Sequence, residues 1–98
     1  MEFTSIEKMS IIFFLNKIME ADMIIDPREV KFLNAMYRKL SVTEEDFPRL
    51  EMMDLEYCKS IISRMEESKL LFAKEVFRDM ALCDEYFDPR ERTLIDSL

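Results

Sequence analysis

Residues 4–20 read TSIEKMSIIFFLNKIME, and this stretch decides the fold. It opens with a capping-box pattern, in which the Thr4 side chain caps the amide of Glu7 and the Glu7 side chain reaches back to Thr4. Its centre is apolar nearly all round, which is typical of a helix buried on most sides. We therefore expect a helix from about Ser5 to Met19 or Glu20, within an all-α fold.

A second helix start stands at Asp26-Pro27-Arg28-Glu29. Asp26 suits the N-cap, Glu29 completes a capping box, and Pro27 suits the first helical position because its missing N–H costs nothing there. Ile25 and Val30 occupy the two positions of a hydrophobic staple. An apolar stripe at helical spacing predicts the buried face of this helix, namely Val30, Leu33, Met36, Tyr37 and Leu40.

The middle of the chain predicts helices on either side of an irregular segment, residues 41–54. Within that segment Thr43 begins a pattern for a short helix, which Pro48 would limit at its fifth residue. Asp54 then caps a helix from Leu55 to about Met65. The apolar face of this helix consists of Leu55, Cys58, Ile61, Ile62 and Met65.

The C-terminal third predicts two more helices. After a break around residues 64–68, a longer helix runs to about Leu82, with its inward face at Leu70, Ala73, Val76, Phe77, Met80 and Ala81. The last helix starts at Asp88-Pro89 and is short for a helix standing alone. Its apolar residues should join the core, or belong to a helix that continues past the sequence: Leu94, Ile95 and Leu98. We expect a compact bundle of about five helices in a single domain, residues 1–98.

The composition argues against catalysis. The 98 residues include no Gly and no His. Without Gly there is no phosphate-binding loop or dinucleotide motif, and tight hairpin turns are disfavoured. Without His the usual general base, the usual zinc ligand and the nucleophile–histidine pairs are absent. Cys58 therefore has no partner for nucleophilic catalysis, and we expect no enzyme.

The charge narrows the range of partners. Fourteen basic residues against 21 acidic residues give a formal net charge of −7. An acidic surface repels phosphate backbones and anionic lipids, so we expect neither nucleic acid nor a membrane as partner. No apolar run approaches the roughly 20 residues of a membrane span, and the N-terminus lacks the features of a signal peptide. Two cysteines, Cys58 and Cys83, indicate free thiols in a cytoplasmic protein.

An internal repeat is the most informative feature for function. Residues 21–29 read ADMIIDPRE and residues 83–91 read CDEYFDPRE, with five of nine positions identical. Each copy follows one predicted helix and precedes another, so the chain contains two helix–loop–helix units. Such repeats often pack about a pseudo-twofold axis, which would bring the two turns onto related faces. Residues 20–29 and residues 82–91 each carry a net charge of −3.

Folding alone explains many of the residues in this repeat. Asp26 and Asp88 suit N-caps, each worth about 1 kcal/mol, and Glu29 and Glu91 suit capping-box partners. Arg28 and Arg90 are expected to be ordinary surface charges. Asp22 and Asp84 are harder to explain, because each lies at the end of a helix, where the macrodipole disfavours negative charge.

The two turns also form a candidate metal site. Carboxylates without His or thiolate suit hard cations, so Ca²⁺ or Mg²⁺ is expected over Zn²⁺. The turns are not EF-hands, because Pro27 and Pro89 stand where that loop needs Gly, and Leu33 and Ile95 stand where it needs Glu. The candidate ligands are Asp22, Asp26, Glu29, Asp84, Asp88 and Glu91.

The repeat resembles the TerB-like family, the helical domain of tellurite-resistance TerB proteins, and is similar to the TerB-like region of DjlA-type co-chaperones. The resemblance is carried by Ala21-Asp22-x-x-Ile25-x-x-x-Glu29 and Asp84-x-x-Phe87-x-x-x-Glu91, and it spans most of the chain. It implies an all-α bacterial protein of the cytoplasm, linked to tellurite and other stress responses, which binds divalent cations on an acidic surface. Met23 and Glu85 depart from the family, which usually has Gly directly after the first Asp.

Two functions follow as expectations. The first is a non-catalytic binding module of the TerB-like type, which holds a divalent cation through its two acidic turns and works with a protein partner. The alternative is a metal-independent interaction module, which docks a basic partner on its acidic face. A third possible function is that of a small hydrolase. It would require a cleft that holds a carboxylate of raised pKa.

Overall fold

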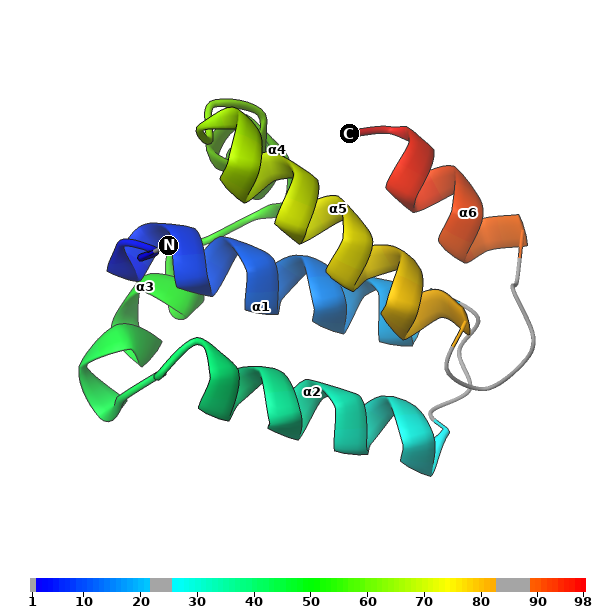
Figure 1. Ribbon diagram of the computed structural model, residues 1–98, viewed down its shortest axis with the longest axis horizontal. Helices are drawn as coiled ribbons and strands as arrows, with labels where there is room; N and C mark the ends of the chain where they lie inside the picture. The colour runs from blue at the N-terminus through cyan, green and yellow to red at the C-terminus, as the bar shows by residue number, and fades with distance from the viewer. Residues whose placement is uncertain (1, 22–25, 83–88) are drawn as a thin grey trace.

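The computed structural model describes residues 2–21, 26–82 and 89–98. Over these residues the chain forms six α-helices, one 3₁₀ turn and no strand, which confirms the predicted all-α fold (Figure 1). In chain order the elements are α1 (Ser5–Glu20), α2 (Pro27–Lys39), the 3₁₀ turn η1 (Glu44–Asp46), α3 (Phe47–Glu51), α4 (Leu55–Ser63), α5 (Glu67–Leu82) and α6 (Pro89–Asp96). None of these helices is long and apolar enough to cross a membrane.

Helix α1 forms the centre of the bundle, and all five other helices pack against it (Figure 1). Its N-terminus has the predicted capping box. The Glu7 amide donates to Thr4 Oγ1 at 3.3 Å, and the Thr4 amide donates to Glu7 Oε1 at 2.8 Å. Because neighbours cover α1 on several sides, most of its apolar side chains are fully buried: Met9, Ile11, Ile12, Phe14, Leu15 and Ile18.

Helix α5 supplies the other main part of the core. The rings of Phe14 and Phe77 lie 4.5 Å apart between centroids, in a tilted arrangement that aromatic pairs favour. The predicted inward face of α5 is buried, with Leu70 partly so. In α6, Ile95 is buried, and its neighbours Leu94 and Leu98 pack against the same core. The apolar residues of the last helix therefore join the core.

An ion pair connects the start of α1 to α5. Lys69 Nζ lies 2.9 Å from Glu7 Oε1, and both side chains are mostly buried. Burial acts to raise the pKa of Glu7, but hydrogen bonds from the Thr4 backbone and the Lys69 side chain outweigh it and hold that pKa below its ordinary value of 4.5. The carboxylate thus stays charged and holds both a helix cap and a contact between helices.

Helix α2 ends in a Schellman motif built on serine. The Ser41 amide donates to the Arg38 carbonyl at 3.1 Å, and the Val42 amide donates to the Tyr37 carbonyl at 3.0 Å. These two bonds require a left-handed residue between them, and Ser41 has a φ of 55°. Glycine usually fills this position without steric cost, but the chain contains no Gly.

The segment after α2 differs from its prediction. Instead of one short helix limited by Pro48, the chain forms the 3₁₀ turn η1 and then α3, with Pro48 in the first turn of α3. Proline is tolerated there because the first N–H groups of a helix have no intrahelical acceptor. Pro48 therefore accompanies a helix start, where the sequence pattern indicated a helix end.

The buried carboxylate of Asp46 fixes η1 and α3 to the rest of the fold. The Ser5 hydroxyl donates to Asp46 Oδ1, and the Thr43 amide donates to Asp46 Oδ2 at 2.9 Å. These hydrogen bonds, the one from Ser5 being the stronger influence, hold the pKa of Asp46 below its ordinary value of 3.8. The start of α1 and the residues before α3 are thereby joined through one side chain.

The predicted buried face of α2 is wrong at one position. Val30 is 38% exposed, whereas its neighbour Glu29 is only 1% exposed. The buried stripe runs through Glu29, Leu33, Met36 and Leu40, and Val30 lies about 100° further round the helix. Val30 is therefore exposed at the position expected for a hydrophobic staple. Its predicted staple partner, Ile25, lies outside the described residues.

Candidate functional site

Four helix ends lie at one end of the bundle. Helices α1 and α5 end there, and helices α2 and α6 begin there (Figure 1). Helix α1 packs against each of the other three. In the sequence these four ends flank the two copies of the repeat, residues 21–29 and residues 83–91. The bundle thus brings the flanking helices of both copies together, and we call this region the acidic end.

Asp26 has the predicted role of N-cap at the start of α2. Its backbone is extended, with φ −85° and ψ 136°, and its Oδ1 accepts a hydrogen bond from the Arg28 amide at 2.7 Å. Glu29 completes the capping box, because its Oε1 accepts from the Asp26 amide at 3.2 Å. The local sequence pattern is sufficient to explain both carboxylates as parts of a helix start.

Arg28 is an exposed surface charge, as predicted, and it also forms an ion pair with Asp26. Its Nε donates to Asp26 Oδ1 at 3.1 Å, and its Nη2 lies 3.0 Å from Asp26 Oδ2. This two-point contact and the backbone bond hold the pKa of Asp26 below its ordinary value of 3.8. A guanidinium group and a carboxylate match in this geometry. A charged partner of Asp26 therefore already exists within the same turn.

Asp22, Asp84 and Asp88 lie outside the described residues, as does the side chain of Glu91, whose backbone belongs to the first turn of α6. Within the described residues there is no group of three or more side chains that could hold a metal ion. Of the six candidate ligands, the structure describes Asp26 and Glu29 in full, and both carboxylates serve the cap of α2.

These contacts define what the first turn can do chemically. A hard cation at Asp26 would have to compete with the guanidinium of Arg28 for the same oxygens. Glu29 is almost fully buried, so its carboxylate is not available at the surface. A cation site at this end would therefore draw mainly on other oxygen ligands.

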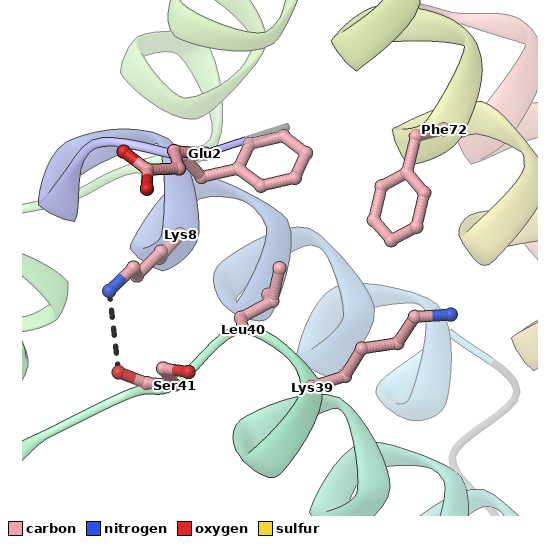
Figure 2. Close-up of a pocket in the computed structure, with 7 residues that line it drawn as sticks. Glu2, Lys8, Lys39, Leu40, Ser41 and Phe72 are labelled. Atoms are coloured by element: carbon pink, nitrogen blue, oxygen red, sulfur yellow. Dashed lines mark hydrogen bonds between the residues drawn. The ribbon is translucent and has the colours of Figure 1, made fainter.

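A cavity of about 430 Å³ lies at the opposite end of α2, against α1 and α5 (Figure 2). Lys8 Nζ donates to the Ser41 carbonyl at 3.3 Å, and Lys39 Nζ lies 5.3 Å from the centre of the Phe72 ring. Both ammonium groups are near the C-terminus of α2, where exposed carbonyl groups favour positive charge. The lining consists of Glu2, Phe3, Lys8, Lys39, Leu40, Ser41 and Phe72.

Sequence reasoning missed this cavity. Its residues come from three separate parts of the chain, near positions 2–8, 39–41 and 72, which only tertiary packing brings together. The pairing of Phe3 with Phe72, whose ring centroids are 5.4 Å apart, closes one wall. The cavity lysines have a role in the fold, since Lys8 binds the Ser41 carbonyl just after α2 and Lys39 covers the ring of Phe72.

Cys58 is a free thiol, as predicted, and it is fully buried. Its Sγ donates to the Ser10 carbonyl at 3.1 Å. Burial raises its pKa to about 12, so the thiol stays protonated at neutral pH. The thiolate is the reactive form of cysteine, and Cys58 is therefore a core residue. The second cysteine, Cys83, lies outside the described residues.

No protein-family model, no curated protein and no solved structure matches the chain.

Proposed function

We propose that this chain is a non-catalytic binding module of the kind implied by its resemblance to TerB-like proteins, and that its acidic end binds a divalent cation. The observation that supports this is the meeting of four helix ends that flank the two copies of the repeat (Figure 1). In the sequence Asp22 directly follows Ala21, the C-cap residue of α1. Asp88 directly precedes Pro89, the first residue of α6. A role in tellurite or other stress responses belongs to the same proposal.

The chemistry favours a hard cation at this end. Residues 20–29 and residues 82–91 together contain eight carboxylates and two arginines, and no His occurs in the chain. Oxygen-rich sites of this kind suit Ca²⁺ or Mg²⁺. Since Asp26 and Glu29 serve the helix cap, Asp22 and Asp84 are the carboxylates on which binding should depend most.

A second candidate function is supported by the contact between Arg28 and Asp26. That contact occupies both oxygens of Asp26 with a guanidinium group. A basic protein partner could present the same kind of group to other carboxylates of the acidic end. This metal-independent docking is the alternative to a cation site, and it would weaken as salt concentration rises.

Thermal melting of chelator-treated protein tests the cation proposal. Ca²⁺, Mg²⁺, Mn²⁺ and Zn²⁺ are each added to the natural protein and to the Asp22→Asn/Asp84→Asn double variant. Binding at about 100 times the dissociation constant adds about 2.7 kcal/mol of stability. Each kcal/mol raises the melting temperature of a domain of this size by roughly 4–8 °C. We expect one ion to stabilise the natural protein and to have no effect on the variant.

The control is the Glu51→Gln/Glu56→Gln double variant, which loses the same two charges from α3 and α4 at the other end of the bundle. It should respond to the ion as the natural protein does. If no ion changes the melting temperature of the natural protein, the cation site is excluded. Titration with a basic peptide at low and high salt then decides whether the docking alternative holds.

A further inference from the structure

A groove of about 490 Å³ lies between the start of α1, helix α3 and the start of α4. Its lining consists of Ile6, Pro48, Arg49, Met52 and Tyr57, of which only Arg49 is charged. The volume is within the range of about 300–1,000 Å³ that binding pockets occupy. We call this feature the α3 groove.

The α3 groove exposes two large apolar side chains, and a third lies nearby in the sequence, where its ring pairs with Tyr37 of α2. Met52 is 83% exposed and Tyr57 is 45% exposed, and Phe47, in the first turn of α3, is 39% exposed. Within the described residues only six large apolar side chains are exposed, and these three fall within residues 47–57. Apolar side chains that gather on a surface mark sites of protein interaction, and methionine adapts its shape to different partners.

Exposed acidic residues are frequent in the segment that supplies most of the lining. Residues 44–57 contain six carboxylates and one arginine, a net charge of −5. Asp46 is buried, whereas Glu44, Glu45, Glu51, Asp54 and Glu56 are all exposed. Glu51 and Glu56 are direct sequence neighbours of the lining residues Met52 and Tyr57. The segment that lines the groove is thus strongly acidic, although the one charged residue of the lining itself is Arg49.

The backbone beneath the groove is held in place from several sides. Asp46 joins η1 to Ser5 of α1, and Asp54 Oδ1 caps α4 by accepting from the Tyr57 amide at 2.8 Å. Met53 is buried beside the exposed Met52, so one methionine fastens the segment to the core while the other faces outward. A groove on such a fixed backbone is already formed before a partner arrives.

We propose that the α3 groove docks a basic amphipathic segment of a partner protein. An apolar side chain of that segment enters the groove beside Met52 and Tyr57, and its Lys or Arg residues face Glu51 and Glu56. A second copy of this chain is disfavoured as the occupant, because two acidic surfaces with net charges of −7 would meet. The proposal goes beyond the acidic end, which lies at the other end of α1 (Figure 1).

Titration calorimetry with a synthetic helical peptide of leucine and lysine tests the proposal on the full chain. Met52→Gln keeps the length of the side chain but makes it polar, and it should weaken binding by about tenfold, which is typical of a central interface residue. Leu71→Gln is the matched control, because Leu71 is 61% exposed on α5 and does not line the groove. It should leave the affinity unchanged. The corresponding peptide of leucine and glutamate should not bind.

Charge variants and chemical-shift mapping locate the binding surface. Glu51→Gln/Glu56→Gln should lower the affinity and its salt dependence, while Asp22→Asn/Asp84→Asn should have the smaller effect. Amide shifts should concentrate around Ile6, Met52 and Tyr57. Equal affinities of Met52→Gln and Leu71→Gln would overturn the proposal. It would also be overturned by shifts concentrated in residues 20–29 and 82–91, which would instead favour docking at the acidic end.

Discussion

At the scale of single residues, Ser41 shows how a chain without glycine ends a helix. Its left-handed conformation places a Cβ near the following carbonyl oxygen, which costs roughly 1–2 kcal/mol. We expect Ser41→Gly to remove most of this cost and to stabilise the protein by about 1 kcal/mol, since glycine also loses more freedom on folding. A rise in the urea midpoint with an unchanged slope would demonstrate it.

The matched control for this prediction is Ser63→Gly. Ser63 is the last residue of α4, with helical backbone, and its hydroxyl donates to the Ser60 carbonyl at 3.0 Å. Glycine there should destabilise the protein by roughly 0.5–1 kcal/mol. If both variants shifted the midpoint in the same direction, the effect at Ser41 could not be attributed to its left-handed conformation.

Single residues also show which features of the acidic end are readable from the sequence. The roles of Asp26 and Glu29 are local, because each bonds a backbone group within three residues, and both were predicted correctly. The contact of Arg28 with Asp26 is just as local, but it depends on the side-chain rotamer of Arg28, which residue spacing does not predict. Whether Asp22 and Asp84 bind a cation stays a prediction.

At the scale of elements, α3 is the helix that depends most on side chains elsewhere. It has only five residues, too few to be stable alone, and the buried Asp46 joins the turn before it to α1. Asp46→Ala would leave the Thr43 amide and the Ser5 hydroxyl without this acceptor. We expect a loss of about 2 kcal/mol, which chemical denaturation measures directly.

Glu45→Ala is the control for that loss, because Glu45 belongs to the same turn but is exposed. An exposed residue away from such contacts usually changes stability by less than about 0.5 kcal/mol. Comparable losses in the two variants would mean that Asp46 is not the anchor of α3.

The helices were predictable where a short capping motif marks the helix start. The starts at Thr4, Asp26 and Asp54 are each defined by a cap within three residues, and the structure has all three. The start of α3 was not predictable, because Pro48 reads equally well as an end or a beginning. Val30 was misplaced for a related reason: a buried glutamate takes the position on α2 that apolar periodicity alone assigns to an apolar residue.

At the scale of the whole molecule, the carboxylates of Glu7, Asp26 and Asp46 connect stability to pH. Each has a folded-state pKa below its ordinary value, so each contributes stability that is present above the ordinary value and is lost as pH falls through the folded value. The free energy of unfolding should therefore begin to decline as pH falls below about 4.5 and continue to fall at lower pH. Urea denaturation across this range measures the slope.

Glu7→Gln separates one contribution from the other two. The variant should be less stable at neutral pH and should show a shallower decline in acid, because its α1–α5 contact no longer depends on a proton. Glu75→Gln, an exposed change on α5, controls for the loss of one negative charge. A Glu7→Gln variant with the same acid slope as the natural protein would contradict this assignment.

The contacts that join the molecule together are those the sequence could not predict. Glu7 meets Lys69, and Ser5 meets Asp46, across long stretches of chain that no local pattern relates. The α3 groove arises in the same way, because Ile6 joins residues 48–57 only after the bundle has packed. Helix periodicity predicts which faces are buried, but not which face meets which.

The central position of α1 has a consequence for how the protein is made. A ribosome completes α1 before any of the five helices that cover it, and it reaches Ile95 of α6 only after roughly 4–15 s, at about 5–20 residues per second. During that interval the helices that cover α1 are made one after another, and part of its apolar surface lacks its final neighbours. Exposed apolar surface makes incomplete chains prone to aggregation, so the order of synthesis leaves α1 the part of the chain most at risk until its partners are in place.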